Sequence, residues 1–387
     1  MRCPHPGEVR ALTGTSPVTG FTSDRFEAVK RAFTENFSRG ECGASLCVIV
    51  EGSVVVDLTG GWCDQERTIP WTHDTLVNSF SVGKGILSLV LARLHHTGAL
   101  DLDRSARDVW PSLSAARDSA ITIAGVAAHR MGLPAVHRSI DAAELFDWDS
   151  MCRHLERQEP WWPPGTTHGY HINTFGFLVG ELAARSTGLS AGQLLEPMRS
   201  QVHDQMFWGV PTNELHRCAE LLWHVPDTAP ATTSDPSGPM EMQRLTYANP
   251  PNFSGVGEVN SARWRQMVHP STNLHATARG VARAYASLED HGFVSPATIE
   301  RLTRTESHGH DAVLGAETHF GVGFQLPTVR RTFGQLPGAF GHYGAGGSMG
   351  YHDVGRRLSV GYVMNQMGKG WQNPRNQALV DAISACL

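Results

Sequence analysis

Residues 80–85 read Phe80-Ser81-Val82-Gly83-Lys84-Gly85, immediately before an apolar run that extends from Ile86 to Leu94. Apolar side chains in this run recur at helical spacing, which predicts Ser81 near a helix N-terminus and Lys84 one turn further on, on the same face. A serine hydroxyl needs an adjacent base to become a nucleophile. A lysine amine becomes a base only where burial or nearby charge lowers its pKa. The pattern therefore predicts a lysine-activated serine, with N–H groups at the helix N-terminus suited to an oxyanion.

Three further stretches follow along the chain: His129-Arg130-Met131-Gly132-Leu133-Pro134, Trp162-Pro163-Pro164-Gly165-Thr166 leading to Tyr170, and Phe340-Gly341-His342-Tyr343-Gly344-Ala345-Gly346-Gly347-Ser348. Ser-x-x-Lys is a signature of penicillin-recognising enzymes. With these motifs in this order, roughly residues 24 to 385 resemble the β-lactamase-like serine enzymes. That group includes class C β-lactamases, DD-peptidases, esterases of the β-lactamase fold and acyltransferase relatives.

The resemblance implies roles for particular residues. Ser81 would be the nucleophile, Lys84 its proton acceptor and Tyr170 the acid/base partner, with a phenolate-like side chain near a cationic lysine. The backbone N–H of Ser81 and that of a strand residue near Gly344 to Gly346 would hold the oxyanion. The substrate-binding residues expected on the same basis are His342, Gly344, Gly346, Trp162 and Asn173.

Two departures from the family pattern bear on the substrate. Class C enzymes have Asn two residues after the tyrosine, whereas this chain has Ile172 there and Asn173 one step later. His342 stands where β-lactamases have the Lys of Lys-Thr-Gly, and histidine is mostly neutral near pH 7. The site therefore lacks a permanent cation for a β-lactam carboxylate, and an uncharged ester or amide fits better.

Two rival motifs occur in the same sequence. Tyr247-Ala248-Asn249 reproduces the Tyr-Ala-Asn of class C enzymes, but it falls out of order and lacks the Pro-Gly approach, so Tyr170 is preferred. Gly346-Gly347-Ser348-Met349-Gly350 spells the Gly-x-Ser-x-Gly of α/β-hydrolases. Only His352-Asp353 follows nearby, in the wrong order and too close, so this stretch is interpreted as a strand edge that lines the site.

Composition narrows the possible partners. The 387 residues carry 32 Lys and Arg against 37 Asp and Glu, a net charge of −5, with 41% hydrophobic residues. The basic residues form no long run, so neither a nucleic-acid nor a membrane partner is expected.

The first residues lack an apolar signal core, which predicts a soluble, cytoplasmic protein. The seven cysteines contain no Cys-x-x-Cys and no His-Glu-x-x-His occurs, so we expect no disulfide framework, metal or cofactor.

Hydrophobic patterns predict an α/β fold, and the resemblance implies that it is of the β-lactamase/DD-peptidase type. A helix is expected over 24–37, a hairpin over 45–58, strands over 321–326, 348–352 and 358–364, and a last helix from about Asn376. Both chain ends would build one antiparallel sheet flanked by helices. The predicted domains are 1–104 with 275–387, which carry the sheet and the Ser81 helix, and a mainly helical insertion over 105–274 that holds a long loop at 225–255.

These observations predict a serine acyl-enzyme hydrolase, with a carboxylesterase for an uncharged small-molecule ester as the first choice. The alternative is a transacylase that passes the acyl group from Ser81 to an amine or alcohol in secondary-metabolite tailoring. Less favoured readings are a β-lactamase or DD-peptidase and a binding module without turnover. The natural substrate, the acceptor and the oligomeric state stay open.

Overall fold

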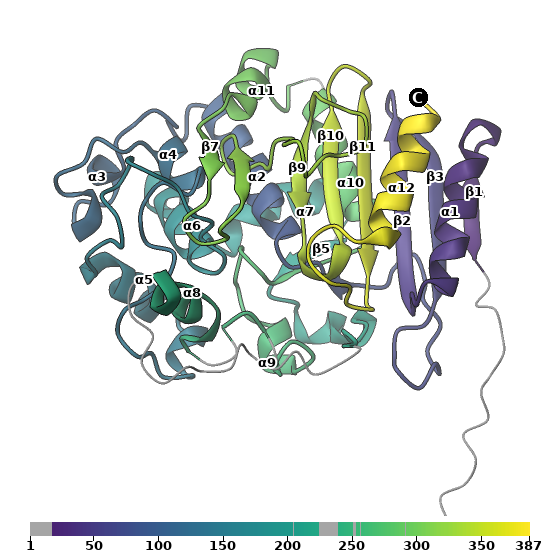
Figure 1. Cartoon of the computed structure of the whole chain (residues 1–387), viewed down its shortest axis with the longest axis horizontal. Coiled ribbons are helices and arrows are strands. Elements are labelled where there is room, and N and C mark those ends of the chain that lie inside the picture. Colours follow the sequence, from purple (N-terminus) through teal and green to yellow (C-terminus); the bar gives the residue numbers. More distant parts are fainter. Residues whose placement is uncertain (1–17, 204, 224–238, 251–252, 256, 291) are drawn as a thin grey trace, which may run out of the picture.

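A six-stranded antiparallel sheet organises the protein, and both ends of the chain build it (Figure 1). The computed structural model describes residues 18–203, 205–223, 239–250, 253–255, 257–290 and 292–387. The strand order is β1-β3-β2-β11-β10-β9. The strands are β1 (Thr19–Thr22), β2 (Gly43–Val50), β3 (Ser53–Gly61), β9 (Ala339–Tyr343), β10 (Met349–Asp353) and β11 (Leu358–Met364). The predicted fold class is confirmed, since the central β2–β11 pair joins the two ends of the sequence.

The hairpin predicted at 45–58 is β2 and β3, joined by a two-residue turn. Glu51 and Gly52 have φ values of 50° and 76°. Two consecutive residues with positive φ are typical of the tight hairpin turn whose twist matches that of the flanking strands. Only glycine adopts this backbone without strain, which explains Gly52.

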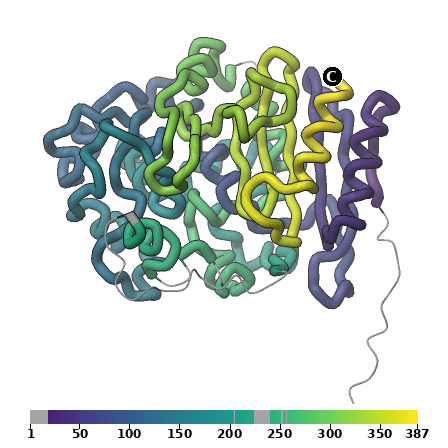
Figure 2. Tube along the Cα trace, in the orientation of Figure 1, coloured from purple at the N-terminus to yellow at the C-terminus, as the bar shows by residue number. Residues whose placement is uncertain are grey.

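Helices cover both faces of the sheet. Helices α1 (Glu27–Ser38) and α12 (Pro374–Ala385) lie side by side in front of it, and α10 (Ala278–Ala286) packs behind it against β11 and β2 (Figures 1 and 2). A Cβ at Gly361 in β11 would lie 2.3 Å from the Ala278 carbonyl oxygen. Glycine at this strand position therefore allows the closest approach of α10 to the sheet.

The segment between β3 and β9 is mainly helical and contains two small sheets. One sheet has the order β4-β6-β5, and β7 pairs with β8. The domain boundaries near 104 and 275 stay a prediction. No helix in the described ranges is long and apolar enough to cross a bilayer. The remaining elements are β4 (Val77–Asn78), α2 (Val82–His96), α3 (Ala106–Val109), α4 (Ile123–Ala127), α5 (Trp148–Arg157), α6 (Thr174–Thr187), α7 (Glu196–Gln201), β5 (Met206–Trp208), α8 (Pro239–Ala248), α9 (Ala262–Arg265), β6 (Leu274–Ala276), α11 (Pro296–Thr303), β7 (Ser307–His310) and β8 (Glu317–Phe320).

One predicted strand is wrong. Residues 321–326 form bends rather than a strand, and β8 ends at Phe320 just before them. Gly323 has a φ of 74°, which an extended strand cannot accommodate. Within this stretch Gln325 alone forms β-bridges, with Phe320 and Gly341.

The predicted 225–255 loop is wrong in part, because it contains helix α8. The helix begins at Pro239, a position where proline is tolerated, and Met242 and Leu245 are buried three residues apart on one face. That spacing was hidden by the polar composition of the surrounding stretch. Residues 224–238, 251–252 and 256 lie outside the described part of the chain.

Candidate active site

Ser81 lies at the N-terminus of α2, on the floor of a cleft of about 970 Å³. The preceding residue, Phe80, has a φ of 47°, a left-handed conformation that is costly for a bulky side chain. Its N–H donates to Asn78 Oδ1 at 2.9 Å, which helps to hold this turn. Backbone strain of this kind collects at functional sites, and here it turns the chain sharply from β4 into α2 at Ser81.

Helix α2 is buried from Val82 to Ala92 because β9, α6, α10 and α11 all pack against it. A Cβ at Gly85 would lie 2.2 Å from the Tyr285 hydroxyl oxygen and 3.2 Å from the Cβ of His342. Glycine in the motif therefore allows α2 to approach β9. This packing brings Lys84 and His342, which are 258 positions apart in the sequence, to the same site.

Lys84 is fully buried, and its amine is held by two backbone carbonyls. The Nζ atom donates to the Ile172 and Ser271 carbonyl oxygens at 2.7 and 2.9 Å and lies 3.1 Å from Ser81 Oγ. Burial lowers the pKa of Lys84 well below its ordinary value of 10.5, and no carboxylate in the described chain forms an ion pair with it. A neutral amine has two N–H groups and one lone pair. With both N–H groups committed to carbonyls, the lone pair faces the Ser81 hydroxyl.

Ile172 stands where class C enzymes have an asparagine, and the structure shows how the site is built without that amide. The backbone carbonyl of Ile172, rather than a side chain, contacts Lys84. A carbonyl cannot be removed by substitution. The departure therefore leaves the lysine positioned, although it removes a side-chain amide from the neighbourhood of the substrate.

The Tyr170 hydroxyl lies between Ser81 and His342. It is 3.5 Å from His342 Nε2, and the side chain also interacts with that of Ser81. His342 Nδ1 is 2.7 Å from the Tyr343 carbonyl oxygen, which only accepts, so Nδ1 carries the proton and Nε2 is the acceptor for Tyr170. Burial, with a smaller contribution from Lys84, lowers the pKa of His342 well below 6.5. The imidazole is therefore neutral.

Tyr170 is a phenol rather than the phenolate-like group expected from the sequence. Its ring is fully buried, and burial raises the pKa of Tyr170 far above 10 despite the opposing interaction with Ser81. The expectation relied on a cationic Lys84 beside the ring. Because burial favours the neutral amine, that cation is lost and the phenol keeps its proton.

Two buried histidines connect the His129–Pro134 stretch to the Tyr170 segment. His171 Nε2 accepts the Leu133 N–H at 3.0 Å, and its Nδ1 donates to the Gly169 carbonyl at 2.6 Å. His129 Nδ1 accepts the His171 N–H at 3.2 Å. Burial lowers the pKa of His171 to about 3, so both hydrogen bonds persist at neutral pH. These histidines hold the backbone around Tyr170 and do not line the cleft.

Asp311 is a buried carboxylate that holds the backbone of Tyr170 in place through hydrogen bonds. Both of its oxygens accept the Tyr170 N–H at 3.0 Å. The N–H groups of Val313 and Leu314 donate at 2.9 Å, and the Thr318 hydroxyl donates at 3.0 Å. No feature of the sequence distinguished this aspartate from its neighbours.

We expect Asp311→Ala to destabilise the fold by about 3 kcal/mol, because it leaves several buried donors without a partner. The free energy of unfolding from urea titration measures the effect. Asp118→Ala, at an exposed aspartate, is the control and should change stability by less than about 0.5 kcal/mol. Equal stability of the two variants would show that the Asp311 network contributes nothing.

Two backbone N–H groups are free to bind an oxyanion. Gly344 N–H donates to the Ser348 carbonyl at 2.7 Å and Gly346 N–H to the Gly370 carbonyl at 3.1 Å. Neither the Ser81 N–H nor the Ala345 N–H has a protein partner in the described part of the chain. The residue expected near Gly344 to Gly346 is therefore Ala345, which lines the cleft but lies in a 3₁₀ turn between β9 and β10 rather than in a strand.

The structure distributes the predicted substrate-binding residues unevenly. Gly346 lines the Ser81 cleft, whereas His342 and Gly344 are buried and are not among its lining residues. Asn173 is buried before α6 and donates to the Thr246 carbonyl at 2.7 Å and to Ser254 Oγ at 3.0 Å. Trp162 packs in a buried cluster beneath Tyr170, away from the cleft surface.

Neither rival motif has the geometry of a catalytic group. Asn249 donates at 2.7 Å to the carbonyls of Val136 and Arg138, so it supports a loop. Ser348 is buried, and its hydroxyl donates to the Ser79 carbonyl at 3.1 Å. Tyr247, the tyrosine of the first rival motif, does line the cleft as part of its wall.

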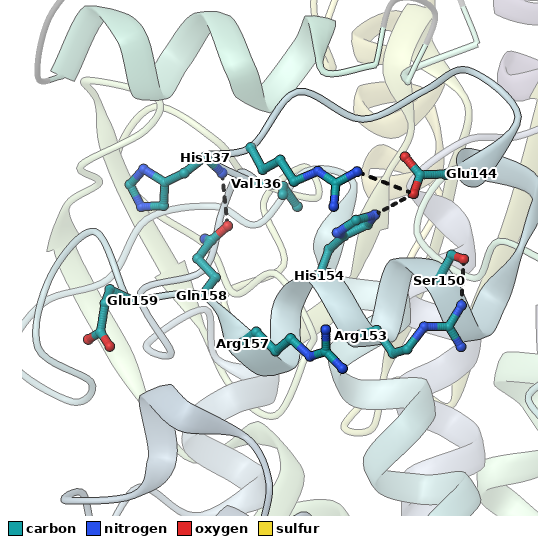
Figure 3. A pocket seen from close by; sticks show the side chains of 10 residues that line it. Val136, His137, Glu144, Ser150, Arg153, His154, Arg157, Gln158 and Glu159 are labelled. Carbon is teal, nitrogen blue, oxygen red and sulfur yellow. Dashed lines mark hydrogen bonds and ion pairs between the residues drawn. The ribbon is translucent and has the colours of Figure 1, made fainter.

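A second cleft, of about 560 Å³, lies beside α5 (Figure 3). Its polar side chains contact one another: Glu144 lies 3.1 Å from His154 and 3.8 Å from Arg138, and Arg153 donates to Ser150 at 2.7 Å. None of its lining residues lines the Ser81 cleft. It holds no arrangement comparable to Ser81, Lys84 and Tyr170.

Comparisons with known proteins show the family to which the chain belongs. The Beta-lactamase family model matches residues 26–384. The chain is 28% identical over 375 residues to the esterase/beta-lactamase LipL of Mycobacterium tuberculosis, covering 90% of this chain and 83% of that protein. A family VIII carboxylesterase structure is 34% identical with a TM-score of 0.87, over 96% of this chain and 100% of its own. A penicillin-binding protein homologue from Caulobacter crescentus is also 34% identical, with a TM-score of 0.86 and the same two coverages.

Proposed function

The chain belongs to the β-lactamase family, and from this premise we propose that it is a carboxylesterase of the family's esterase branch with Ser81 as the nucleophile. One observation carries the proposal: the buried amine of Lys84, held by two backbone carbonyls, lies 3.1 Å from Ser81 Oγ. This arrangement activates a serine hydroxyl without any other base. The similarity to LipL and to a family VIII carboxylesterase supports an ester as substrate.

Acylation follows from the positions of these groups. Lys84 Nζ takes the Ser81 proton as Oγ attacks the ester carbonyl carbon. The developing oxyanion receives hydrogen bonds from the Ser81 and Ala345 N–H groups. As the C–O bond breaks, the Tyr170 phenol gives its proton to the leaving alkoxide, and the proton on Lys84 then restores the phenol.

Deacylation uses the same groups in reverse. The neutral Lys84 amine accepts a proton from water, the resulting hydroxide attacks the acyl carbonyl carbon, and Ser81 Oγ leaves with that proton. An amine or alcohol in place of water would give the transacylase reaction. No contact in the described cleft selects one acceptor over the others, so hydrolysis is the proposal and acyl transfer is its alternative.

A neutral His342 favours esters that are uncharged next to the reacting carbonyl. Burial holds the imidazole neutral, and its Nε2 is already the acceptor for Tyr170. It therefore offers no positive charge to a carboxylate beside the scissile bond. For this reason we do not propose β-lactam hydrolysis or peptidase action. Separately, the cytoplasmic location expected from the sequence stays a proposal.

Intact mass spectrometry with 4-nitrophenyl butyrate tests the proposal. A single butyryl adduct should form on the wild-type protein and be absent from Ser81→Ala. Decay at a rate independent of added amine indicates an esterase, and faster decay with formation of the amide indicates a transacylase. A folded protein that forms no adduct and shows no turnover with this ester or with bulkier methyl esters and thioesters would refute the proposal.

Tyr170→Phe should affect substrates according to their leaving groups. A protonated phenol matters where the leaving alkoxide is basic, and general-acid catalysis of this kind is worth about 10²-fold. We expect kcat/KM for ethyl butyrate to fall by about 10²-fold, and for 4-nitrophenyl butyrate by less than about tenfold. Equal losses on both esters would contradict the leaving-group role and assign Tyr170 to activation of Ser81.

A further inference from the structure

Positive charge is concentrated around the mouth of the Ser81 cleft. Of the residues that line it, Arg330, Arg331 and Lys369 are cationic, and none of the lining residues in the described chain is Asp or Glu. Lys369 is one of only three lysines in the sequence, and another is Lys84. The protein as a whole has a net charge of −5. The cleft is therefore locally opposite in sign to the molecule.

Arg331 connects the mouth to the reacting groups through aromatic rings. Its guanidinium lies 4.6 Å from the centre of the Trp371 ring, and that ring lies 4.9 Å from Tyr170. Stacking on an aromatic face orients a guanidinium while its N–H groups remain available. Burial lowers the pKa of Arg331 below 12.5, so part of its hydration has already been lost.

The three cations have no acidic partner within the described residues. No carboxylate forms an ion pair with Arg330, Arg331 or Lys369 there. Asp311, which acts on Arg331 electrostatically, is buried and already accepts hydrogen bonds from Tyr170, Val313, Leu314 and Thr318. Cations grouped at a cleft without counter-charges attract anionic ligands and raise their local concentration.

We propose that the mouth formed by Arg330, Arg331 and Lys369 is an anion subsite, and that the preferred substrates are esters with a negatively charged group remote from the scissile bond. This inference rests on the proposed esterase function and adds the substrate class. The remote anion contacts the mouth, while the ester itself lies over Ser81, where the buried, neutral His342 adds no positive charge. A substrate with a negative charge at its far end is therefore compatible with the proposal that it is uncharged next to the reacting carbonyl.

Matched pairs of esters that differ only in charge test the subsite. For the acyl side, the pair is mono-4-nitrophenyl glutarate and its methyl ester. For the alcohol side, it is 3-(butyryloxy)benzoate and its methyl ester. The ratio of kcat/KM for the anionic to the neutral member measures the preference, and it should exceed one in at least one pair and fall as salt is added.

The Arg330→Gln/Lys369→Gln double variant should lower this ratio about three- to tenfold, mainly through KM for the anionic ester. Both side chains are exposed, so the substitution leaves the core intact. Lys30→Gln/Arg117→Gln removes the same charge from α1 and from a surface loop, and should leave the ratio unchanged. Arg331→Gln should lower the ratio further, since this guanidinium stacks on Trp371, whose ring contacts Tyr170.

Equal rates within both ester pairs, or a ratio that the double variant does not change, would overturn the subsite while leaving the esterase proposal in place. If the protein hydrolyses none of these esters, the proposed function fails. In that case the anion subsite is tested separately, by measuring ligand binding without turnover. Quenching of the cleft tryptophans in Ser81→Ala should require less monomethyl glutarate than dimethyl glutarate, and equal affinities would refute the subsite.

Discussion

Ser81→Ala is expected to lower kcat/KM for 4-nitrophenyl butyrate by at least about 10⁴-fold, because it removes the hydroxyl that lies 3.1 Å from the buried Lys84 amine. The N–H groups of Ser81 and Ala345 remain in the variant, so some catalysis over water is retained. Substitution of a small side chain at the start of α2 should leave the thermal unfolding midpoint within a few degrees of wild type. Steady-state rates, intact mass and circular dichroism measure the three quantities.

Ser348→Ala is the matched variant for this prediction. Its serine lies in the Gly-x-Ser-x-Gly stretch, but its hydroxyl is committed to the Ser79 carbonyl. We expect its activity to stay within about tenfold of wild type, a loss that small shifts of the neighbouring backbone would explain. Loss of the acyl adduct in Ser348→Ala with retention in Ser81→Ala would overturn the assignment of the nucleophile.

Lys84→Met should lower kcat/KM by about 10³-fold, the contribution expected of a positioned general base. Methionine fits the apolar part of the site but has no lone pair of comparable basicity and no N–H for the Ile172 and Ser271 carbonyls. Lys84→Arg distinguishes a role as proton acceptor from a role as positive charge, because arginine stays protonated and cannot accept the Ser81 proton. Both variants should be equally inactive. Activity near wild type in Lys84→Arg would show that a positive charge, rather than a base, is required.

The pH dependence gives an independent readout of Lys84. The folded pKa lies below 10.5, so kcat/KM should fall as the pH is lowered through that depressed pKa and the amine gains a proton. Between the depressed pKa and 10.5, the unfolded chain holds a proton that the folded protein lacks, so stability rises with pH. Below that window, burial of the charged amine lowers stability. The wild-type slope should exceed that of Lys84→Met in urea titrations across this window, and identical slopes would contradict a depressed pKa.

The short spacing of Ser81 and Lys84 was sufficient to place them on one helix face, whereas the resemblance to the family supplied the fold type and the place of Tyr170 beside them. The β2–β3 hairpin and the β11 strand were equally local and were predicted correctly. The error at 321–326 came from Gly323, whose positive φ cannot be read from an apolar run. The helix within 225–255 was missed because its two buried residues lie in a polar stretch.

The sequence by itself therefore determined the strands at both chain ends and the Ser81–Lys84 pair through local patterns, and its resemblance to the family indicated the fold type and Tyr170. Only the tertiary structure decided which carbonyls hold Lys84, that Ala345 offers the second free N–H, and that Asp311 supports Tyr170. It also placed Arg330, Arg331 and Lys369 around one cleft. Contacts of this kind join residues far apart in the chain, and burial and charge at such contacts depend on packing that no local pattern specifies.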